Sequence, residues 1–136
     1  MNAASILTAI QDRIEALDPF DCATTGDRFR GHVGGEPPLN MDRTFSVGSS
    51  LPARATDFLS PTDYVVTVAI AVAYQDGDAA LARILTDAEQ IAETIYEMGS
   101  DLGVVIDQVP EGQIHQGPVA NTLIAARMFR LRYTLG

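Results

Sequence analysis

The chain contains no lysine and no tryptophan, and its 136 residues include a single cysteine and two histidines. With Cys22 alone, an intrachain disulfide is impossible and a zinc site built from cysteines is excluded. All nine basic residues are arginines, and 18 acidic residues bring the formal net charge to −9. Because gripping a nucleic-acid backbone requires a basic surface, this charge argues against a nucleic-acid-binding function. The negative charge would suit the wall of a channel for nucleic acid, because such a wall repels the phosphates and does not retain them.

Long apolar runs are also missing. The longest candidate, residues 64–74, is too short to cross a bilayer as a helix. The first residues lack the basic region of a secretory signal, so we expect none, and a reducing cytoplasm is the simplest compartment. Hydrophobic residues make up 46% of the chain, which suits a folded protein, and the length makes one domain, 1–136, the default.

Residues 64–74 form the most informative stretch, because they alternate by size and not by polarity. An antiparallel strand with one side in water normally alternates apolar with polar residues, but neither face here carries a charge. We therefore expect something to cover the small face as well, either the long loop described below or a neighbouring subunit. The large face holds Tyr64, Val66, Val68, Ile70, Val72 and Tyr74. The small face, a candidate subunit contact, holds Val65, Thr67, Ala69, Ala71 and Ala73.

Two amphipathic helices are predicted on either side of this strand. Apolar residues recur at helical spacing over residues 3–17 and again over 79–98. We expect Asp78 to cap the start of the second helix and Gly99 to end it.

The remaining segments predict the rest of the fold. Residues 20–61 are rich in glycine and proline and are interpreted as a long loop or arm, with a short strand at 43–47. Further strands are expected from residue 103 onward, the last over residues 122–135. The fold class is therefore α+β, with two helices packed on one face of a small, mostly antiparallel β-sheet and a long loop after the first helix.

No motif predicts catalysis, a cofactor or a metal. His32 and His115 would have to converge with a carboxylate to hold a metal ion, and Asp76-Gly77-Asp78 is more typical of a turn and a helix cap than of a metal site. The glycine-rich residues 31–35 match neither the P-loop nor the dinucleotide fingerprint. A small α+β enzyme or ligand-binding domain, with a site under the long loop, remains an alternative.

Three arginines near the end of the chain attract attention. Arg127 precedes Arg130 and Arg132, and the last two share one face of the predicted strand, two residues apart. On an acidic protein such a pair should find carboxylates, either within the chain or across a subunit boundary. Arg130 and Arg132 are thus candidate subunit contacts, with an ordinary solvated strand face as the alternative.

The order of the elements resembles the tail-terminator proteins of long-tailed bacteriophages and related prophage minor tail proteins. The resemblance covers the first helix at 3–17, the loop, the strand 63–74, the helix 78–98 and the closing strand ending Phe129-Arg130-Leu131-Arg132-Tyr133.

This resemblance implies a structural protein of the virion tail, in the neck region, made in the cytoplasm of a bacterial host. It implies a hexameric ring that caps the tail tube and contacts the tail tube protein and the head-side connector or stopper protein. DNA would pass through the lumen without specific binding. It implies no catalysis and no membrane. Another head–tail connector component, an adaptor or a stopper, is the nearest alternative.

Overall fold

The structure is a computed structural model, and it describes residues 1–33, 42–55, 62–108 and 112–135. Three helices and seven strands are formed by these residues. In chain order they are α1 (Ala3–Glu15), α2 (Cys22–Thr25), β1 (Arg30–Val33), β2 (Thr44–Ser49), β3 (Ala53–Arg54), β4 (Asp63–Gln75), α3 (Ala80–Leu102), β5 (Val105–Gln108), β6 (Gln113–Gln116) and β7 (Thr122–Thr134).

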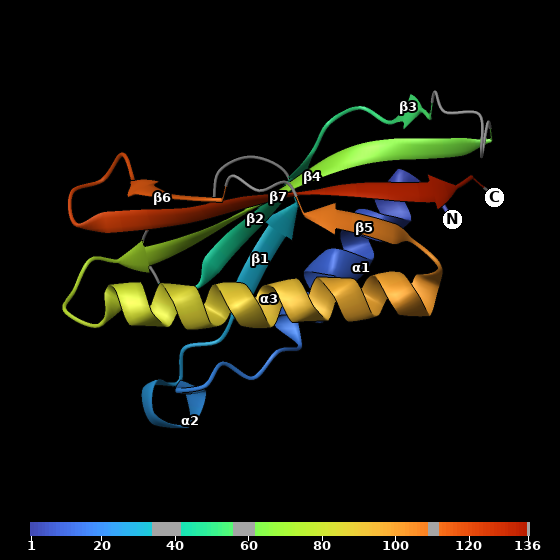
Figure 1. The fold of residues 1–136 in the computed structure, drawn as a ribbon. Helices are drawn as coiled ribbons and strands as arrows, with labels where there is room; N and C mark the ends of the chain where they lie inside the picture. Colours follow the sequence, from blue (N-terminus) through green and yellow to red (C-terminus); the bar gives the residue numbers. More distant parts are fainter. Residues whose placement is uncertain (34–41, 56–61, 109–111, 136) are drawn as a thin grey trace.

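One sheet contains all seven strands, in the order β1-β2-β4-β7-β5 (Figure 1). Its centre is the antiparallel pair β4 and β7, which runs in register over 13 residues, from Asp63 opposite Thr134 to Gln75 opposite Thr122. The short strand β3 pairs with β4, and β6 pairs with β7. Among the described strands, β1 and β2 are the one pair that runs in parallel. The expected α+β class with a mostly antiparallel sheet is confirmed.

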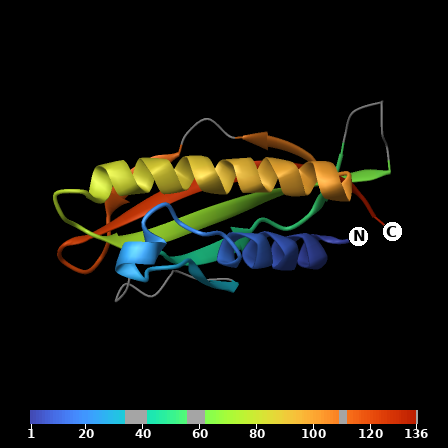
Figure 2. The same cartoon turned by 90° about the horizontal axis from the view of Figure 1, so that it is seen from below.

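Both long helices cover the same face of the sheet, as predicted. Figure 2 shows α1 and α3 side by side on that face, running in opposite directions. The large face of β4 points toward them, and Val66, Val68, Ile70, Val72 and Tyr74 are all buried in the core. From α1 the core receives Ile6, Ile10 and Ile14, and from α3 it receives Ile84, Ile91, Ile95 and Met98. Burying these apolar stripes is the main stabilising contribution to the two-layer fold.

The ends of the helices differ in part from the prediction. A capping box between Asn2 and Ser5 starts α1. The first residue before α3 is Ala79, without a side-chain cap, so the prediction of Asp78 as the N-cap is wrong. Gly99 is buried within α3, where an added Cβ would meet Ile106 and the carbonyl of Val104, and the helix ends instead at Gly103 with φ +70°. Gly99 thus serves close packing, whereas Gly103 provides the left-handed residue that ends a helix.

The largest correction concerns residues 20–61, which are not one long loop. Their described parts contain α2, β1, β2 and β3, and β2 lies inside the sheet between β1 and β4. The short strand expected at 43–47 is observed as β2, shifted by one or two residues. Glycines and prolines in the rest of this segment obscured the patterns of β1 and β3. Because β1 and β2 pair in parallel, no local turn signal marks their pairing either. Residues 34–41 and 56–61 lie outside the described residues.

Candidate functional site

The sheet has a second face, which no described helix covers. We call it the helix-free face. The small residues of β4 lie on it, and the register places their partners beside them: Ser46 and Ala126 flank Ala71, while Gly48 and Met128 flank Ala69. Toward the far end, Thr67 lies opposite Arg130, which in turn lies opposite Asp107 of β5. Val65 lies opposite Arg132. All seven residues predicted as subunit contacts therefore share one face.

Burial changes along this face. At one end Ala73, Thr44, Ser46 and Ile124 are buried. From Val65 to Ala71 the small residues are half-buried. The face is open from its middle, where Met128 is 47% exposed, to its other end, where Val105 is 59% exposed. The open half thus presents apolar surface beside charge. The segments 34–41 and 56–61 of the predicted covering loop are not described, so what covers the small face stays a prediction.

The two predicted arginines have different environments. Arg132 donates from Nε to Asp63 Oδ2 at 2.8 Å, and Thr134 Oγ1 donates to the other oxygen of the same carboxylate. Its carboxylate partner therefore lies within the chain. Arg130 is exposed and forms no ion pair with any described residue, although Asp107 is its cross-strand neighbour. Of the two, Arg130 is the arginine still available to a second molecule.

The structure places several of the histidines and aspartates that were weighed as metal ligands. His115 lies on β6 and is exposed. Asp76 and Asp78 follow β4 in a turn in which the Asp76 amide donates to Asn121 O. Within the described ranges no three His, Cys, Asp or Glu side chains gather in a way that could hold an ion. The same ranges contain no helix both long enough and apolar enough to cross a membrane.

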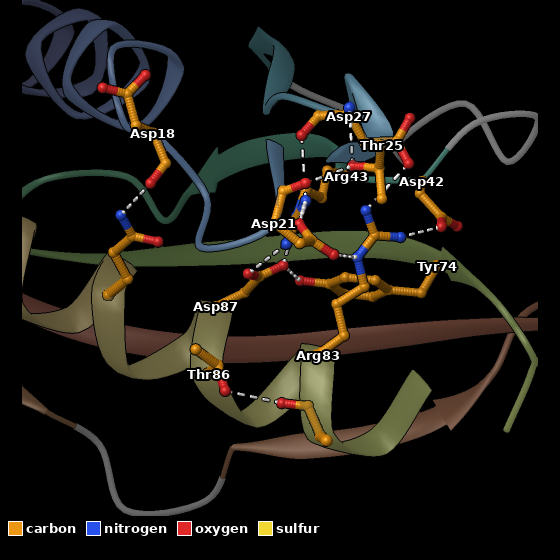
Figure 3. A network of polar contacts seen from close by, with 12 residues as sticks. Asp18, Asp21, Thr25, Asp27, Asp42, Arg43, Tyr74, Arg83, Thr86 and Asp87 are labelled. Atoms are coloured by element: carbon orange, nitrogen blue, oxygen red, sulfur yellow. Dashed lines mark hydrogen bonds and ion pairs between the residues drawn. The ribbon is translucent and has the colours of Figure 1, made fainter. Parts of the chain in front are cut away.

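A buried ionic cluster at one end of the domain was not predicted (Figure 3). At its centre, the fully buried Arg43 forms a two-point contact with the fully buried Asp87 of α3. Its Nε donates to Oδ2 at 2.7 Å and its Nη2 to Oδ1 at 2.9 Å. Tyr74 OH donates to Asp87 Oδ2 at 2.8 Å. Such fork-to-fork pairing is among the strongest polar contacts in proteins.

The cluster continues through the residues before and after α2. Arg43 Nη1 donates to Asp21 Oδ1 at 2.6 Å and to the carbonyl of Asp27 at 3.1 Å. Arg83 of α3 donates to the carboxylates of Asp27 and Asp42. Its Nε lies 3.2 Å from Asp21 Oδ2 but is not aligned to donate a hydrogen bond to any described residue. This end of α3 is thus tied to the stretch that the sequence suggested was a free loop.

Pairing controls the protonation of the cluster. Burial by itself would lower the pKa of Arg43, but the hydrogen bonds and charges of Asp87 and Asp21 outweigh it and raise that pKa. Burial and the nearby Asp87 carboxylate raise the pKa of Tyr74. For Asp21, burial acts to raise the pKa, yet the hydrogen bond from Arg43 and the two arginine charges lower it overall. These shifts keep Arg43 a cation, Asp21 a carboxylate and Tyr74 a neutral donor at neutral pH.

This arrangement serves structure and not surface chemistry. Asp87 is fully buried, and its oxygens already accept from Arg43 and Tyr74, so no solute reaches it. Two local signals could have indicated the cluster. Asp87 lies among the apolar positions of α3. On the large face of β4, Tyr64 and Tyr74 are the two residues whose side chains end in a polar group. Neither signal identifies a partner.

Comparison with protein-family models and with curated proteins identifies no relative of this chain. No protein-family model matches the chain, and no curated protein matches it significantly. The functional conclusion therefore depends on the geometry of the helix-free face and on the charge of the chain.

Proposed function

We propose that this protein is a structural component of a bacteriophage tail, a tail terminator that forms a hexameric ring at the neck of the virion. The ring caps the tail tube and joins it to the head-side connector or stopper, and DNA passes through its lumen. The observation that carries the proposal is the helix-free face. A two-layer domain with a face that no described helix covers, whose open part holds small and apolar residues, is suited to packing against another molecule.

Charge supports the same proposal. A net charge of −9 on 136 residues disfavours contact with phosphates, as a channel for DNA requires. Arg130 provides an exposed cation on the helix-free face of this acidic molecule. A neighbouring copy offers carboxylates in abundance, so a contact through this face is electrostatically favourable.

The mass of the protein in solution tests the proposal. We expect multi-angle light scattering and native mass spectrometry to detect a hexamer, either for the protein alone or after mixing with the tail tube protein. We expect no retention on immobilised DNA at physiological salt. A monomer that persists in the presence of tail tube protein would refute the proposal, whereas a ring that binds only the head-side connector would favour an adaptor or a stopper.

Variants locate the contact. Ala69→Glu introduces a charge at the centre of the half-buried part of the helix-free face, and Arg130→Glu reverses its exposed cation. Both should shift the mass toward the monomer. Arg54→Glu is the matched control, because Arg54 is exposed on β3 opposite Tyr64, whose side chain is on the helix-covered face. If all three variants assemble like the unaltered protein, the helix-free face is not the subunit contact.

A further inference from the structure

A cavity of about 200 Å³ opens between α3 and the strands β4, β6 and β7. Most of its lining is apolar, with polar groups contributed by Tyr74, Gln113 and Arg127. Ile70, Ile84, Ile91 and Phe129 form its buried floor, and Leu85 and Ile114, which are 52% and 42% exposed, lie at its rim. Ala88 of α3 and Ala125 of β7 also line it, and their small side chains leave space that larger residues would fill. The cavity lies on the helix-covered face, away from the surface proposed for assembly.

Arg127 gives this cavity a chemical preference. Among the described residues that line the cavity it is the one that carries a charge. It lies on the inward face of β7, where its neighbours in the pattern, Ala125 and Phe129, are apolar. Its hydrogen bond is from Nη1 to the carbonyl of Ala88 at 3.3 Å. That carbonyl is inside α3 and already serves as a helix acceptor.

Among the described residues, the Arg127 guanidinium has one weak acceptor. Arginine offers five N–H donors, and a neutral carbonyl at 3.3 Å is a weak partner for one of them. The other nitrogens of Arg127 reach solvent, since Arg83 Nε is the one fully buried side-chain donor without a partner among the described residues. A carboxylate could replace the water at these donors, because it pairs with a guanidinium through two parallel hydrogen bonds.

We infer that the cavity binds a small amphiphile with an unbranched apolar body and one carboxylate head, the class of short and medium-chain fatty acids, with its head at Arg127. The size agrees, since an apolar cavity of about 150 Å³ is large enough to bind benzene and this one, which is open at its rim, measures about 200 Å³. The rim residues Leu85 and Ile114 would contact a chain that extends outward. This inference is independent of ring assembly.

The probe is octanoate, titrated into the isotope-labelled full-length protein and followed by two-dimensional NMR. We expect saturable shifts at the amides of Ala88, Ile114 and Ala125. 1-Octanol has the same apolar chain without the charge and should bind about tenfold more weakly. Arg127→Gln should weaken octanoate binding by about tenfold and leave octanol binding unchanged. Arg54→Gln is the matched control, because Arg54 is exposed on β3 and does not line the cavity, and it should bind octanoate like the unaltered protein.

Two more variants keep the inference falsifiable. Ala88→Leu fills the cavity and should abolish binding of both probes; if it fails to fold, the comparison of octanoate with octanol still decides. Glu111→Gln removes a carboxylate that precedes the cavity residue Gly112 in sequence but lies outside the described residues. If octanoate binds only to that variant, Arg127 is satisfied within the chain and the inference is wrong. Absence of saturable shifts, or equal binding by Arg127→Gln, would also overturn it. So would a change of oligomeric state without octanoate binding, which would assign the cavity to a side chain of a second copy.

Discussion

Removing the Asp87 carboxylate should be among the most destabilising single substitutions in this chain. Asp87→Ala leaves the fully buried Arg43 without two of its hydrogen bonds and leaves Tyr74 OH without its acceptor. Breaking a buried ion pair from one side costs about 3–5 kcal/mol, because the remaining charge stays buried and unpaired. Asp21 and the Asp27 carbonyl still hold Nη1 of Arg43, so we expect the lower half of that range.

The loss is large relative to the whole, since domains of this kind are stable by about 5–15 kcal/mol. Urea unfolding followed by far-UV circular dichroism measures it, and the chain's lack of tryptophan does not affect that signal. At about 4 °C per kcal/mol for a chain of this size, a loss of about 3–4 kcal/mol should lower Tm by about 12–16 °C. If Asp87→Ala does not fold, Asp87→Asn, which keeps one acceptor oxygen, gives a smaller loss of the same origin.

Two controls make the experiment decisive. Asp101→Ala breaks the exposed pair with Arg13, at 3.1 Å, and should cost less than about 1 kcal/mol. The double variant Arg43→Ala/Asp87→Ala should lose about 1–3 kcal/mol less free energy of unfolding than the two single variants lose in sum, because it leaves no buried charge unpaired in that contact. If Asp87→Ala costs no more than the Asp101 control, or if the two losses simply add, the Arg43–Asp87 ion pair does not stabilise the fold.

Three further predictions use the same unfolding assay. Because the pKa of Tyr74 is raised in the folded state, its hydroxyl contributes fully to the free energy of unfolding below the ordinary tyrosine pKa of about 10, and this contribution is lost as pH rises above it. Tyr74→Phe should therefore be less stable at neutral pH and should lose less of its stability on going to alkaline pH. An alkaline slope that Tyr74→Phe leaves unchanged would contradict this. The lowered pKa of Asp21 acts in the opposite direction, with stability present above about pH 4 and lost as pH falls further, so Asp21→Asn should flatten the acid side of the stability profile. Gly103→Ala should cost about 1 kcal/mol from its positive φ alone, since an added Cβ meets no atom there. Gly31→Ala should cost more, because its Cβ would overlap the ring of the buried Phe45; equal losses at the two glycines would show that the ring moves aside.

The sequence by itself determined the elements whose patterns are local. The helical stripes of α1 and α3 and the size alternation of β4 are repeated every few residues, so each element and its buried face can be identified without knowing its neighbours. The same alternation placed Val65, Thr67 and Ala69 with Arg130 on one face once β4 and β7 were paired. It also predicted two helices on the opposite face, because the large side chains of β4 match their apolar stripes.

Only the tertiary structure decided which distant residues meet. Arg43 and Asp87 are 44 residues apart, and nothing in a local pattern links a residue in a glycine-rich stretch to an aspartate on a helix. The same limit hid the place of β2 in the sheet, between β1 and β4. It also hid the difference between the two arginines, since Arg132 finds Asp63 across 69 residues while Arg130 stays exposed. Periodicity is set by the backbone of one element, whereas ion pairs, cavities and the choice of sheet neighbours depend on how the elements pack together.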